Sequence, residues 1–512
     1  MSKAVLKKGT VYLVGAGPGD PGLLTLKSAK LLAEADVIIY DRLVNPDLLE
    51  WNHRAKKIYA GKQGDERVNG NRDIEQEMTN RLMVEWARAG KHVVRLKGGD
   101  PFIYGRGGEE ASYLRSRKIP FEVVPGVSAG FAVPAYAGIP VTDRRYASTV
   151  TFITGHEDFH KKHIAVNWKH LAKLGGTIVS FMGVKNLPAI MRALMREGLP
   201  PTTKVSVIES GTLPIQRVVQ GNLRSIVRFV KQKRIKAPAL TVIGGVNALR
   251  KQIAWFEQRP LYGKTVLITR SRSQASGLKR VLEDRGAHVL EYPAIRILPP
   301  LDFKGLDQAI ASIAKYDWIV FTSVNGVEAV FNRLLELGKD ARSFSQVKIA
   351  AIGEATEEAL RSRGLHVDLM PERFTSESLM EKLQETNKIH GYSFLLPRTD
   401  KAPRYLREKL EALGANVTEI VAYRTVEARR DRAKLCHWLR EETIDYILFT
   451  SSSTVENFFK AAGKLSNKKG TARCVSIGPV TSQTLRDFGV KPYREAHDHT
   501  ISGLVEVLCH EK

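Results

Sequence analysis

The sequence predicts an α/β protein made of two halves, and three observations lead to this prediction. Strand-like apolar runs alternate with amphipathic stretches along the first half. Each run ends in glycine, aspartate or another turn residue. The second half repeats itself at a nearly constant spacing. Alternating strands and helices are typical of α/β folds, in which ligands bind at the carboxyl ends of the strands.

The first half contains eight predicted strands, and an amphipathic stretch usually follows each of them. The strands lie at residues 11–17, 35–41, 92–100, 121–126, 150–156, 177–183, 204–211 and 239–245. Pro260 and Gly263 break a helix after these strands. We therefore divide the chain into two predicted domains, residues 1–259 and 260–512.

The second half carries an internal duplication. "DWIVFTSVNGVEAVF" from Asp317 matches "DYILFTSSSTVENFF" from Asp445 at an offset of 128 residues. "TVLITR" from Thr265 matches "SFLLPR" from Ser393 at the same offset, and "AIGEATEEALRSRG" matches "SIGPVTSQTLRDFG" at an offset of 125. This pattern predicts two similar α/β lobes with a ligand cleft between them.

The chain is strongly basic, with a net charge of +25. Residues 1–260 hold 41 Lys and Arg against 22 Asp and Glu, so most of the excess lies in the first half. A basic protein attracts anionic partners. The densest run, "KQKRIK" at residues 231–236, lacks interleaved aromatic residues, so we interpret it as an exposed helix end. We expect a polycarboxylate small molecule and no nucleic acid.

Cysteine usage and hydropathy indicate the compartment. The cysteines Cys436, Cys474 and Cys509 lie far from any C-x-x-C spacing, so they form neither a disulfide framework nor a metal motif. We therefore expect a reducing cytoplasm. The apolar runs are too short for a signal peptide or a transmembrane helix, so no membrane association is expected.

The stretch "GAGPGDPGLLTL" begins at Gly15, directly after a strand. From Gly17 it fits the dinucleotide pattern G-x-G-x-x-G, and Asp41 ends a strand about twenty residues later, where a ribose-binding acid would lie. However, Pro18 and Pro21 remove backbone donors that would cradle a pyrophosphate. The pattern alone leaves three interpretations open: an NAD site, a plain strand–helix turn, and a site for another adenosine-type ligand.

A second glycine-rich segment, "VVRLKGGDPFIYGRGGEE", covers residues 93–110. Gly98 and Gly99 let the backbone approach a ligand closely. Asp100 can hold a ribose or a cationic group, and Arg106 can bind a carboxylate. A plain flexible loop is the alternative, although such long loops are uncommon without a function.

The segment "HEDFH" at residues 156–160 fits the zinc-protease signature H-E-x-x-H. That motif needs a helix, because only then do the two histidines share a face. Here it directly follows a strand, where a loop is expected, and no third ligand stands at a recognised spacing, although His163 is nearby. We predict no metal site.

The first half resembles uroporphyrinogen-III C-methyltransferases of the tetrapyrrole methylase family. The resemblance covers about residues 9–257 and rests on "LVGAGPGDPGLLTL", "YDRLV", "GK", "RLKGGDPFIYGRGGEE", "VVPGVSA", "AYAGIPVTDR" and "TFITGH". It implies S-adenosylmethionine, not NAD, bound between two α/β lobes, and a homodimer through this half. The cofactor positions that it implies are Pro18, Gly98, Gly99, Asp100, Ile103, Ser128, Ala129, Met182 and Gly211.

The same resemblance places an acid/base pair on Asp41 and Lys62. In the implied reaction an electron-rich pyrrole carbon attacks the sulfonium methyl group in line. A proton must then leave, and a positioned carboxylate can take it. The alternatives are a helix N-cap for Asp41 and a substrate-carboxylate contact for Lys62, and Arg106 is a further candidate substrate contact.

The second half resembles uroporphyrinogen-III synthases over about residues 262–508. The resemblance rests on "ITR", "FTSVNGV", "IGEAT", "PR", "VAYRT", "FTSSSTVENF" and "IGPVT". It implies an open-chain tetrapyrrole, held between two lobes without a cofactor, that loses hydroxide and closes with inversion of its last pyrrole. Tyr423 matches the tyrosine thought to help water leave.

Candidate substrate contacts in the second half lie at strand ends or helix starts, where backbone N–H groups suit carboxylates. They are Thr322, Ser323, Ser451, Ser452 and Thr481, and helix N-capping is an alternative role compatible with binding. Arg270 and Arg398 occupy equivalent repeat positions, where they could hold carboxylates or form surface ion pairs.

These observations predict a bifunctional enzyme of the sirohaem and cobalamin branch. The second half would cyclise hydroxymethylbilane to uroporphyrinogen III, and the first would transfer two methyl groups to that product, giving precorrin-2. One alternative is a methylase of a later corrin intermediate. The other is a basic tetrapyrrole- or nucleic-acid-binding protein whose second half is a non-catalytic clamp.

Overall fold

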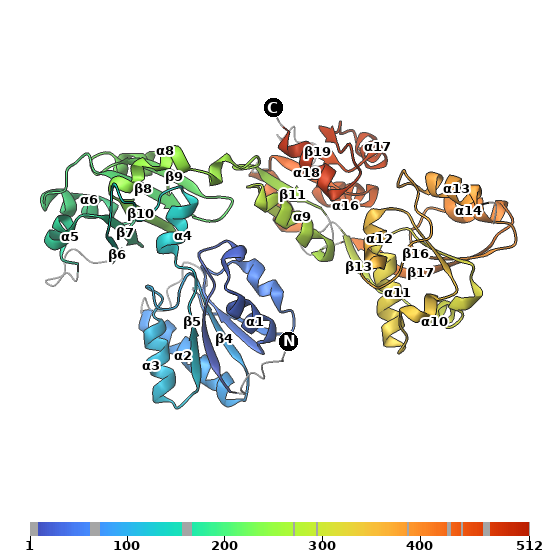
Figure 1. Cartoon of the computed structure of the whole chain (residues 1–512), viewed down its shortest axis with the longest axis horizontal. Coiled ribbons are helices and arrows are strands. Elements are labelled where there is room, and N and C mark those ends of the chain that lie inside the picture. The colour runs from blue at the N-terminus through green and yellow to red at the C-terminus, as the bar shows by residue number, and fades with distance from the viewer. Residues whose placement is uncertain are drawn as a thin grey trace. The chain divides into compact units, whose positions relative to one another are not determined.

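The computed structural model describes residues 9–61, 72–155, 166–269, 272–292, 295–386, 389–427, 432–441, 444–463 and 472–510. The chain divides into two compact units, Met1–Gly263 and Lys264–Lys512 (Figure 1). The division lies four residues beyond the end of the first predicted domain, because Leu261 and Tyr262 pack with the first unit. Leu261 is buried, and the Tyr262 hydroxyl donates to the carbonyl of Gln216.

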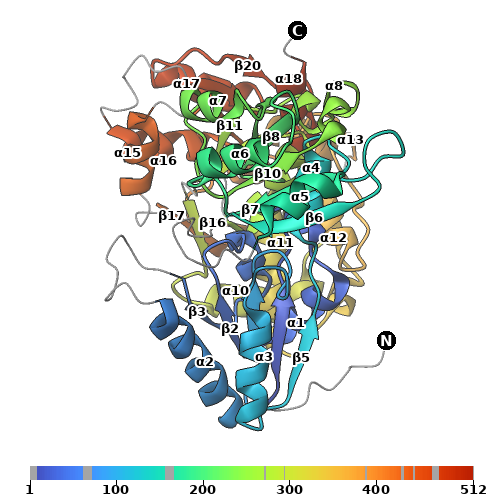
Figure 2. The same cartoon turned by 90° about the vertical axis from the view of Figure 1, so that its left-hand side faces the viewer.

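The first lobe of the first unit is built on a fully parallel sheet in the order β3-β2-β4-β1-β5. Its strands are β1 (Val11–Gly15), β2 (Val37–Tyr40), β3 (Lys56–Tyr59), β4 (Val93–Lys97) and β5 (Phe121–Val124). Helix α1 (Leu26–Glu34) covers one face, and α2 (Arg72–Arg88) and α3 (Gly107–Ser116) cover the other, side by side (Figure 2). The central strands are apolar because both faces are covered.

The second lobe carries a mixed sheet in the order β6-β7-β10-β8-β9. Strand β10 (Ala239–Ile243) runs antiparallel to its two neighbours, β7 and β8. The other elements are β6 (Val150–Thr154), β7 (Thr177–Phe181), β8 (Lys204–Glu209), β9 (Arg217–Asn222), α4 (Ala129–Tyr136), α5 (Trp168–Leu174), α6 (Leu187–Arg196), α7 (Ile226–Gln232) and α8 (Arg250–Ile253). Residues 231–234 of the basic run are exposed at the end of α7.

All eight strands predicted for this unit are present, as β1, β2, β4, β5, β6, β7, β8 and β10. The sequence prediction missed β3 and β9. Both are edge strands, and their sequences KKIY and RVVQGN contain few apolar residues. An edge strand is half solvated, so it does not need the continuous apolar run that marks a central strand.

The second unit contains two more five-stranded sheets, which we call lobe A (β12-β11-β18-β19-β20) and lobe B (β13-β17-β16-β14-β15). The strands are β11 (Thr265–Ile268), β12 (His288–Glu291), β13 (Ile295–Leu298), β14 (Trp318–Phe321), β15 (Lys348–Ala351), β16 (Ser393–Thr399), β17 (Asn416–Glu427), β18 (Tyr446–Phe449), β19 (Arg473–Ser476) and β20 (Arg494–Glu495). The helices are α9 (Arg272–Asp284), α10 (Lys304–Ala311), α11 (Val324–Glu336), α12 (Glu354–Arg361), α13 (Ser376–Glu385), α14 (Tyr405–Ala412), α15 (Arg432–Arg440), α16 (Ser452–Ala462), α17 (Pro479–Asp487) and α18 (Ile501–Cys509).

The two sequence repeats exchange strands between these lobes. Strand β11 of the first repeat pairs with β18 of the second, in register Val266↔Tyr446. Strand β14 of the first repeat pairs with β16 of the second, in register Trp318↔Phe394. The two pairings are equivalent, because the offset of 128 residues relates Val266 to Phe394 and Trp318 to Tyr446. The predicted lobes therefore exist, but each is assembled from both repeats.

A pair of aspartates fixes this exchange at equivalent positions. In lobe A the carboxylate of Asp445 accepts from the backbone N–H of Thr265 at 2.7 Å. In lobe B the carboxylate of Asp317 accepts from the backbone N–H of Ser393 at 2.8 Å. Each aspartate therefore satisfies the first backbone donor of a strand that comes from the other repeat.

Candidate functional site

Three glycines bring the loops of the first lobe into direct backbone contact where the strands end. They are Gly15 at the end of β1, Gly99 after β4 and Gly126 after β5. A Cβ atom on Gly126 would lie 2.2 Å from the Gly99 carbonyl oxygen, and one on Gly15 would lie 2.4 Å from the Gly126 Cα. Gly17 and Gly99 also exchange backbone hydrogen bonds of 3.2 and 2.6 Å. Only glycine permits this approach.

Asp100 holds this loop cluster together through its carboxylate. One oxygen accepts from the Gly126 N–H at 3.0 Å and the other from the Phe102 N–H at 2.8 Å. Gly98 lies beneath Leu43, because a Cβ on it would meet the Leu43 Cβ at 2.9 Å. These predicted cofactor residues are thus brought together by the fold, and Asp100 already has backbone partners.

Left-handed backbone conformations gather in the loops after the strands of both lobes. Of the seven non-glycine residues with positive φ in the described part of the chain, five lie there: Tyr104 and Arg106 after β4, Met182 after β7, and Ser210 and Thr212 after β8. The other two, Lys118 and Arg234, follow α3 and α7. Such conformations cost free energy in residues with a side chain, and they cluster at functional sites. The strain therefore marks the same loops that the sequence predicts to bind the cofactor.

The two lobes of the first unit contact each other through these loops. The backbone N–H of Asp20 donates to the Thr212 hydroxyl at 3.1 Å, and the Tyr136 hydroxyl donates to the Asp20 carboxylate at 2.7 Å. Tyr104 packs against Phe181 with ring centroids 4.9 Å apart. The predicted residue Pro18 lies in the same first loop, two residues before Asp20.

The remaining predicted cofactor residues lie on the same loops or at the start of α4. Ser128 is the N-cap of α4 and accepts from the Gly130 N–H, and Ala129 begins the helix. Gly211 packs so closely on Val133 that a Cβ would lie 2.3 Å from a methyl carbon. Ile103 and Met182 are exposed, the latter by 51%, and they offer apolar contacts at the loops.

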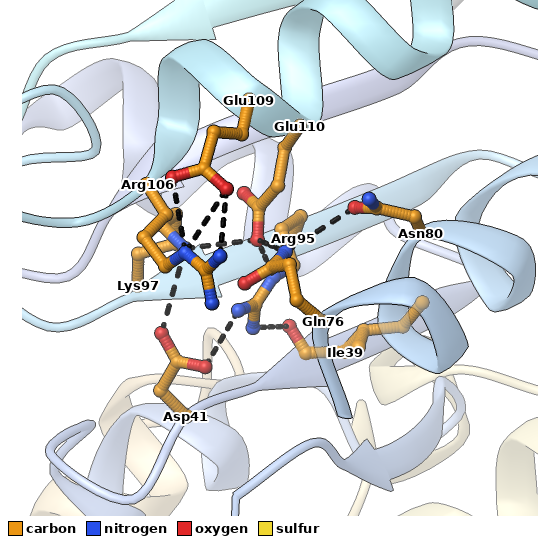
Figure 3. Close-up of polar contacts among 9 residues, drawn as sticks. All are labelled: Ile39, Asp41, Gln76, Asn80, Arg95, Lys97, Arg106, Glu109 and Glu110. Atoms are coloured by element: carbon orange, nitrogen blue, oxygen red, sulfur yellow. Dashed lines mark hydrogen bonds and ion pairs between the residues drawn. The ribbon is translucent and has the colours of Figure 1, made fainter. Parts of the chain in front are cut away.

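Asp41 directly follows β2 and is held by two cations from β4 (Figure 3). One carboxylate oxygen accepts from Arg95 at 2.6 Å, and the other lies 3.7 Å from the Lys97 ammonium. The following 3-10 helix begins at Pro46 and is capped by Asn45. The alternative role of Asp41 as a helix N-cap is therefore wrong, and 31% of its side chain remains exposed.

Glu110 of α3 closes this cluster from the buried side (Figure 3). Its Oε1 accepts from Arg95 at 3.0 Å, from Lys97 at 3.0 Å and from Gln76 at 3.1 Å. Arg95, Lys97 and Glu110 are all almost completely buried. Removing one partner of a buried ion pair leaves an uncompensated charge, which typically costs about 3–5 kcal/mol.

The sequence prediction missed Arg95, Lys97 and Glu110. The available signal was two cations, two residues apart, inside the apolar strand "VVRLK", because such residues share one face of a strand. Burial, and next the positive charge of Arg95, lower the pKa of Lys97 below its ordinary value. Charged groups so deeply buried beside an exposed carboxylate indicate a functional site.

Some predicted residues are paired elsewhere or lie outside the described residues. Arg106 precedes α3 and forms an ion pair with Glu109 at 2.8 Å. The residues that the structure does not describe include Lys62, Arg270 and the histidines of "HEDFH". Among the residues described, no group of three or more His, Cys, Asp or Glu could hold a metal ion.

Tyr423 is the centre of the candidate site in the second unit. It lies within β17, and its side chain is buried. Its hydroxyl lies 3.0 Å from the Ser323 hydroxyl. Burial raises the pKa of Tyr423, while hydrogen bonds from Ser323 and Asn325 lower it less. The phenol therefore stays protonated at neutral pH.

The predicted serine and threonine residues lie where parallel strands give way to helices. Ser323 caps α11 and Ser451 caps α16 at the equivalent repeat position. Thr322 directly follows β14 and precedes Ser323, while Ser452 accepts from the Thr484 hydroxyl at 2.8 Å. Thr481 is buried within α17. The capping role is thus present at two of the five positions.

Arg398 is not a surface residue. It is buried in β16, and one terminal nitrogen donates to the Pro403 carbonyl at 2.8 Å and to Glu419 at 3.2 Å. The alternative of a surface ion pair is therefore wrong for Arg398, because its guanidinium is buried where it pairs with Glu419. None of the helices that the structure describes is long and apolar enough to span a membrane.

Comparison with known proteins matches both units. Residues 10–227 match the family of tetrapyrrole (corrin/porphyrin) methylases, and residues 276–506 match the family of uroporphyrinogen-III synthase HemD. A porphyrin biosynthesis protein HemD of Ruminiclostridium josui is 34% identical over 508 residues, which are 98% of this chain and 98% of that protein.

Two further comparisons concern the first unit alone. An S-adenosyl-L-methionine-dependent uroporphyrinogen III methyltransferase of Methanosarcina barkeri is 51% identical over 239 residues, 46% of this chain and 92% of that protein. The crystal structure of a uroporphyrin III C-methyl transferase from Thermus thermophilus is 37% identical and covers 47% of this chain and 99% of its own, with a TM-score of 0.40. Because the full-length match spans both units, this chain belongs to both families and is a fusion of a tetrapyrrole methylase with a uroporphyrinogen-III synthase.

Proposed function

We propose that the first unit transfers two methyl groups from S-adenosylmethionine to uroporphyrinogen III, giving precorrin-2. The observation that carries this proposal is the cluster of Gly15, Gly99 and Gly126 beside Asp41. Backbone contacts hold the loops together without side chains between them, and the exposed carboxylate lies at the end of the neighbouring strand. The relatives named as uroporphyrinogen III methyltransferases support the assignment.

The residues of this unit fit a sulfonium cofactor better than a dinucleotide. Two prolines occupy the first loop, so it offers few backbone donors to a pyrophosphate. Met182 and Ile103 supply exposed apolar surface for a thioether or an adenine ring. When bound, S-adenosylmethionine supplies an electrophilic methyl group. Asp41 accepts the proton that the methylated ring releases, and Lys62 contacts the substrate or shares in proton transfer.

The second unit cyclises hydroxymethylbilane to uroporphyrinogen III in the same proposal. Tyr423 donates a proton to the departing hydroxide, because its phenol is protonated at neutral pH and the Ser323 hydroxyl orients it. The starts of α11 and α16 offer backbone N–H groups to substrate carboxylates. The net charge of +25 favours these polycarboxylate substrates.

We further propose the oligomeric state, the partners, the cellular compartment and the pathway branch of the enzyme. The enzyme forms a homodimer through its first unit, acts without nucleic acid or membrane, and works in the cytoplasm. The free cysteines Cys436, Cys474 and Cys509 support a reducing compartment. The product serves the sirohaem or cobalamin branch, as expected for a twice-methylated tetrapyrrole.

A coupled assay tests both activities on the intact chain. Hydroxymethylbilane and S-adenosylmethionine are supplied together, and the products are identified by mass. Precorrin-2 is the expected product, and isothermal calorimetry should show S-adenosylmethionine binding without NAD binding. If methylation occurs only when a later corrin intermediate is supplied, the first unit is a different methylase. DNA binding without either reaction would contradict the proposal altogether.

A further inference from the structure

Four charges form one chain from the interior of the first lobe to the exposed Asp41 (Figure 3). Arg95 and Lys97 lie two residues apart on β4 and therefore point to the same side. Each cation contacts both carboxylates: Arg95 lies 3.0 Å from Glu110 and 2.6 Å from Asp41, and Lys97 lies 3.0 and 3.7 Å from them. Only the Asp41 end of this chain is substantially exposed.

The charges in this cluster balance, two against two. The other groups drawn around Asp41 do not change that balance: Gln76 and Asn80 of α2 are neutral, and Arg106 is paired with Glu109 at the start of α3 (Figure 3). Without the negative charge of Glu110, both cations would act on Asp41 alone. Without the positive charge of Lys97, Arg95 would be shared by two carboxylates.

We propose that Arg95, Lys97 and Glu110 are positioning residues for methyl transfer, which together set the orientation and ionisation of the Asp41 carboxylate. This inference rests on the proposed function, in which Asp41 is the proton acceptor. Arg95 holds Oδ1 of Asp41 at 2.6 Å, so Oδ2 is the oxygen that receives the proton.

The proton balance of the step is simple. The bond from the pyrrole carbon to the methyl group forms as the bond from sulfur to that methyl group breaks, and the sulfonium becomes a neutral thioether. The methylated ring carries the positive charge until it releases a proton to Oδ2 of Asp41. The carboxylic acid so formed then returns its proton to water, because part of the Asp41 side chain is exposed.

The burial of the cluster explains why its effect on Asp41 should be large. Charges interact more strongly where water is excluded, and both cations lie within 3.7 Å of the Asp41 carboxylate. The lowered pKa of Lys97, caused first by burial and next by Arg95, indicates that the groups are coupled. Among the described residues the second oxygen of Glu110 has no hydrogen-bond partner, so this carboxylate acts through the oxygen that binds the two cations.

The test measures the rate of methylation of supplied uroporphyrinogen III against pH, using the full chain. Glu110→Gln leaves both cations acting on Asp41, which stabilises its ionised form. The acid limb of kcat should move down by roughly one pH unit, and the plateau should fall because the base is weaker. Lys97→Met removes a cation, so the acid limb should move up by roughly one unit. Glu85→Gln, an exposed position on α2, is the matched control and should change neither.

Two internal controls show that each variant is folded. Calorimetry measures S-adenosylmethionine binding by the first unit, and the cyclisation rate of hydroxymethylbilane reports the second unit of the same molecule. If Lys97→Met does not bind the cofactor, the test rests on Glu110→Gln alone. Its amide has the shape of the carboxylate, so this variant should keep the fold of the site. A downward shift then supports the proposal, and an unmoved or rising limb overturns it.

Shifts of the two variants in the same direction would also overturn the positioning role. This failure is distinguishable from failure of the proposed function. A wild-type chain that does not methylate uroporphyrinogen III contradicts the proposed function itself. If the wild-type chain methylates it and the acid limb of an Asp41→Asn variant is unchanged, Asp41 is not the proton acceptor. That result contradicts the positioning proposal as well.

Discussion

At the scale of the residue, Tyr423 shows how the second unit can supply a proton without a charged acid. Burial keeps its phenol protonated, and the hydrogen bond of 3.0 Å to the Ser323 hydroxyl holds the phenol oxygen in place. Ile295 stands at the equivalent repeat position, so the duplication does not require a tyrosine here. One repeat alone therefore supplies the phenol, although Ile295 and Tyr423 both belong to lobe B.

Tyr423→Phe removes the hydroxyl and keeps the packing of the ring. Cyclisation should slow by roughly 10- to 1,000-fold, which overlaps the rate contribution that one general acid usually makes. Because hydroxymethylbilane also closes by itself without inversion, the product should shift from isomer III towards isomer I. Chromatography of the oxidised isomers measures this ratio, and methylation of added uroporphyrinogen III should stay intact. An unchanged rate and isomer ratio would reduce Tyr423 to a packing residue.

Asp100 is expected to act on the cofactor through the loop that it holds. Asp100→Ala leaves the N–H groups of Gly126 and Phe102 without their acceptor, and it removes a carboxylate that can bind the ribose. S-adenosylmethionine binding, measured by calorimetry, should weaken by about 1–3 kcal/mol. Asp100→Asn keeps one acceptor oxygen and should lose less. Wild-type affinity in the alanine variant would show that Asp100 does not contribute to the cofactor site.

At the scale of the element, the ends of β1, β4 and β5 depend on backbone contact. Gly126→Ala places a Cβ atom 2.2 Å from the Gly99 carbonyl oxygen, so the loops must separate. S-adenosylmethionine affinity should fall more than about tenfold, the equivalent of about 1.4 kcal/mol. The thermal midpoint of the first unit should fall as well.

Gly108→Ala is the matched control for that substitution. Gly108 lies at the start of α3, and a Cβ atom there would meet nothing within 4 Å. Alanine favours a helix over glycine by roughly 0.5–1 kcal/mol, so this variant should be as stable as the wild type or more so. Equal loss of affinity in both variants would mean that the close approach at Gly126 is unimportant.

At the scale of the whole molecule, the unit boundary at Gly263 predicts two separable enzymes. Residues 1–263 should methylate supplied uroporphyrinogen III, and residues 264–512 should cyclise hydroxymethylbilane. Fragment 1–259 should be less stable than 1–263 by about 1.5–3 kcal/mol, because it lacks the buried side chain of Leu261. Denaturant unfolding measures the difference. Fragments that are active only when co-expressed would instead indicate one integrated unit.

The sequence by itself determined the two families, the α/β class and most of the strands of the first unit. Glycine and aspartate at the strand ends carry this information, because close backbone approach and turn geometry permit few other residues. The predicted residues Gly98, Gly99, Asp100 and Asp41 could be named for the same reason, since they lie within contiguous motifs.

The tertiary structure alone decided which distant residues meet. Edge strands β3 and β9 have no apolar signature, and the exchange of strands between the repeats depends on long-range pairing that no local pattern records. The partnership of Asp41 with Arg95 joins two strands that are distant in the sequence. Such a charge is recognisable in the sequence, but its partner is fixed only when the parallel strands pair and water is excluded around them.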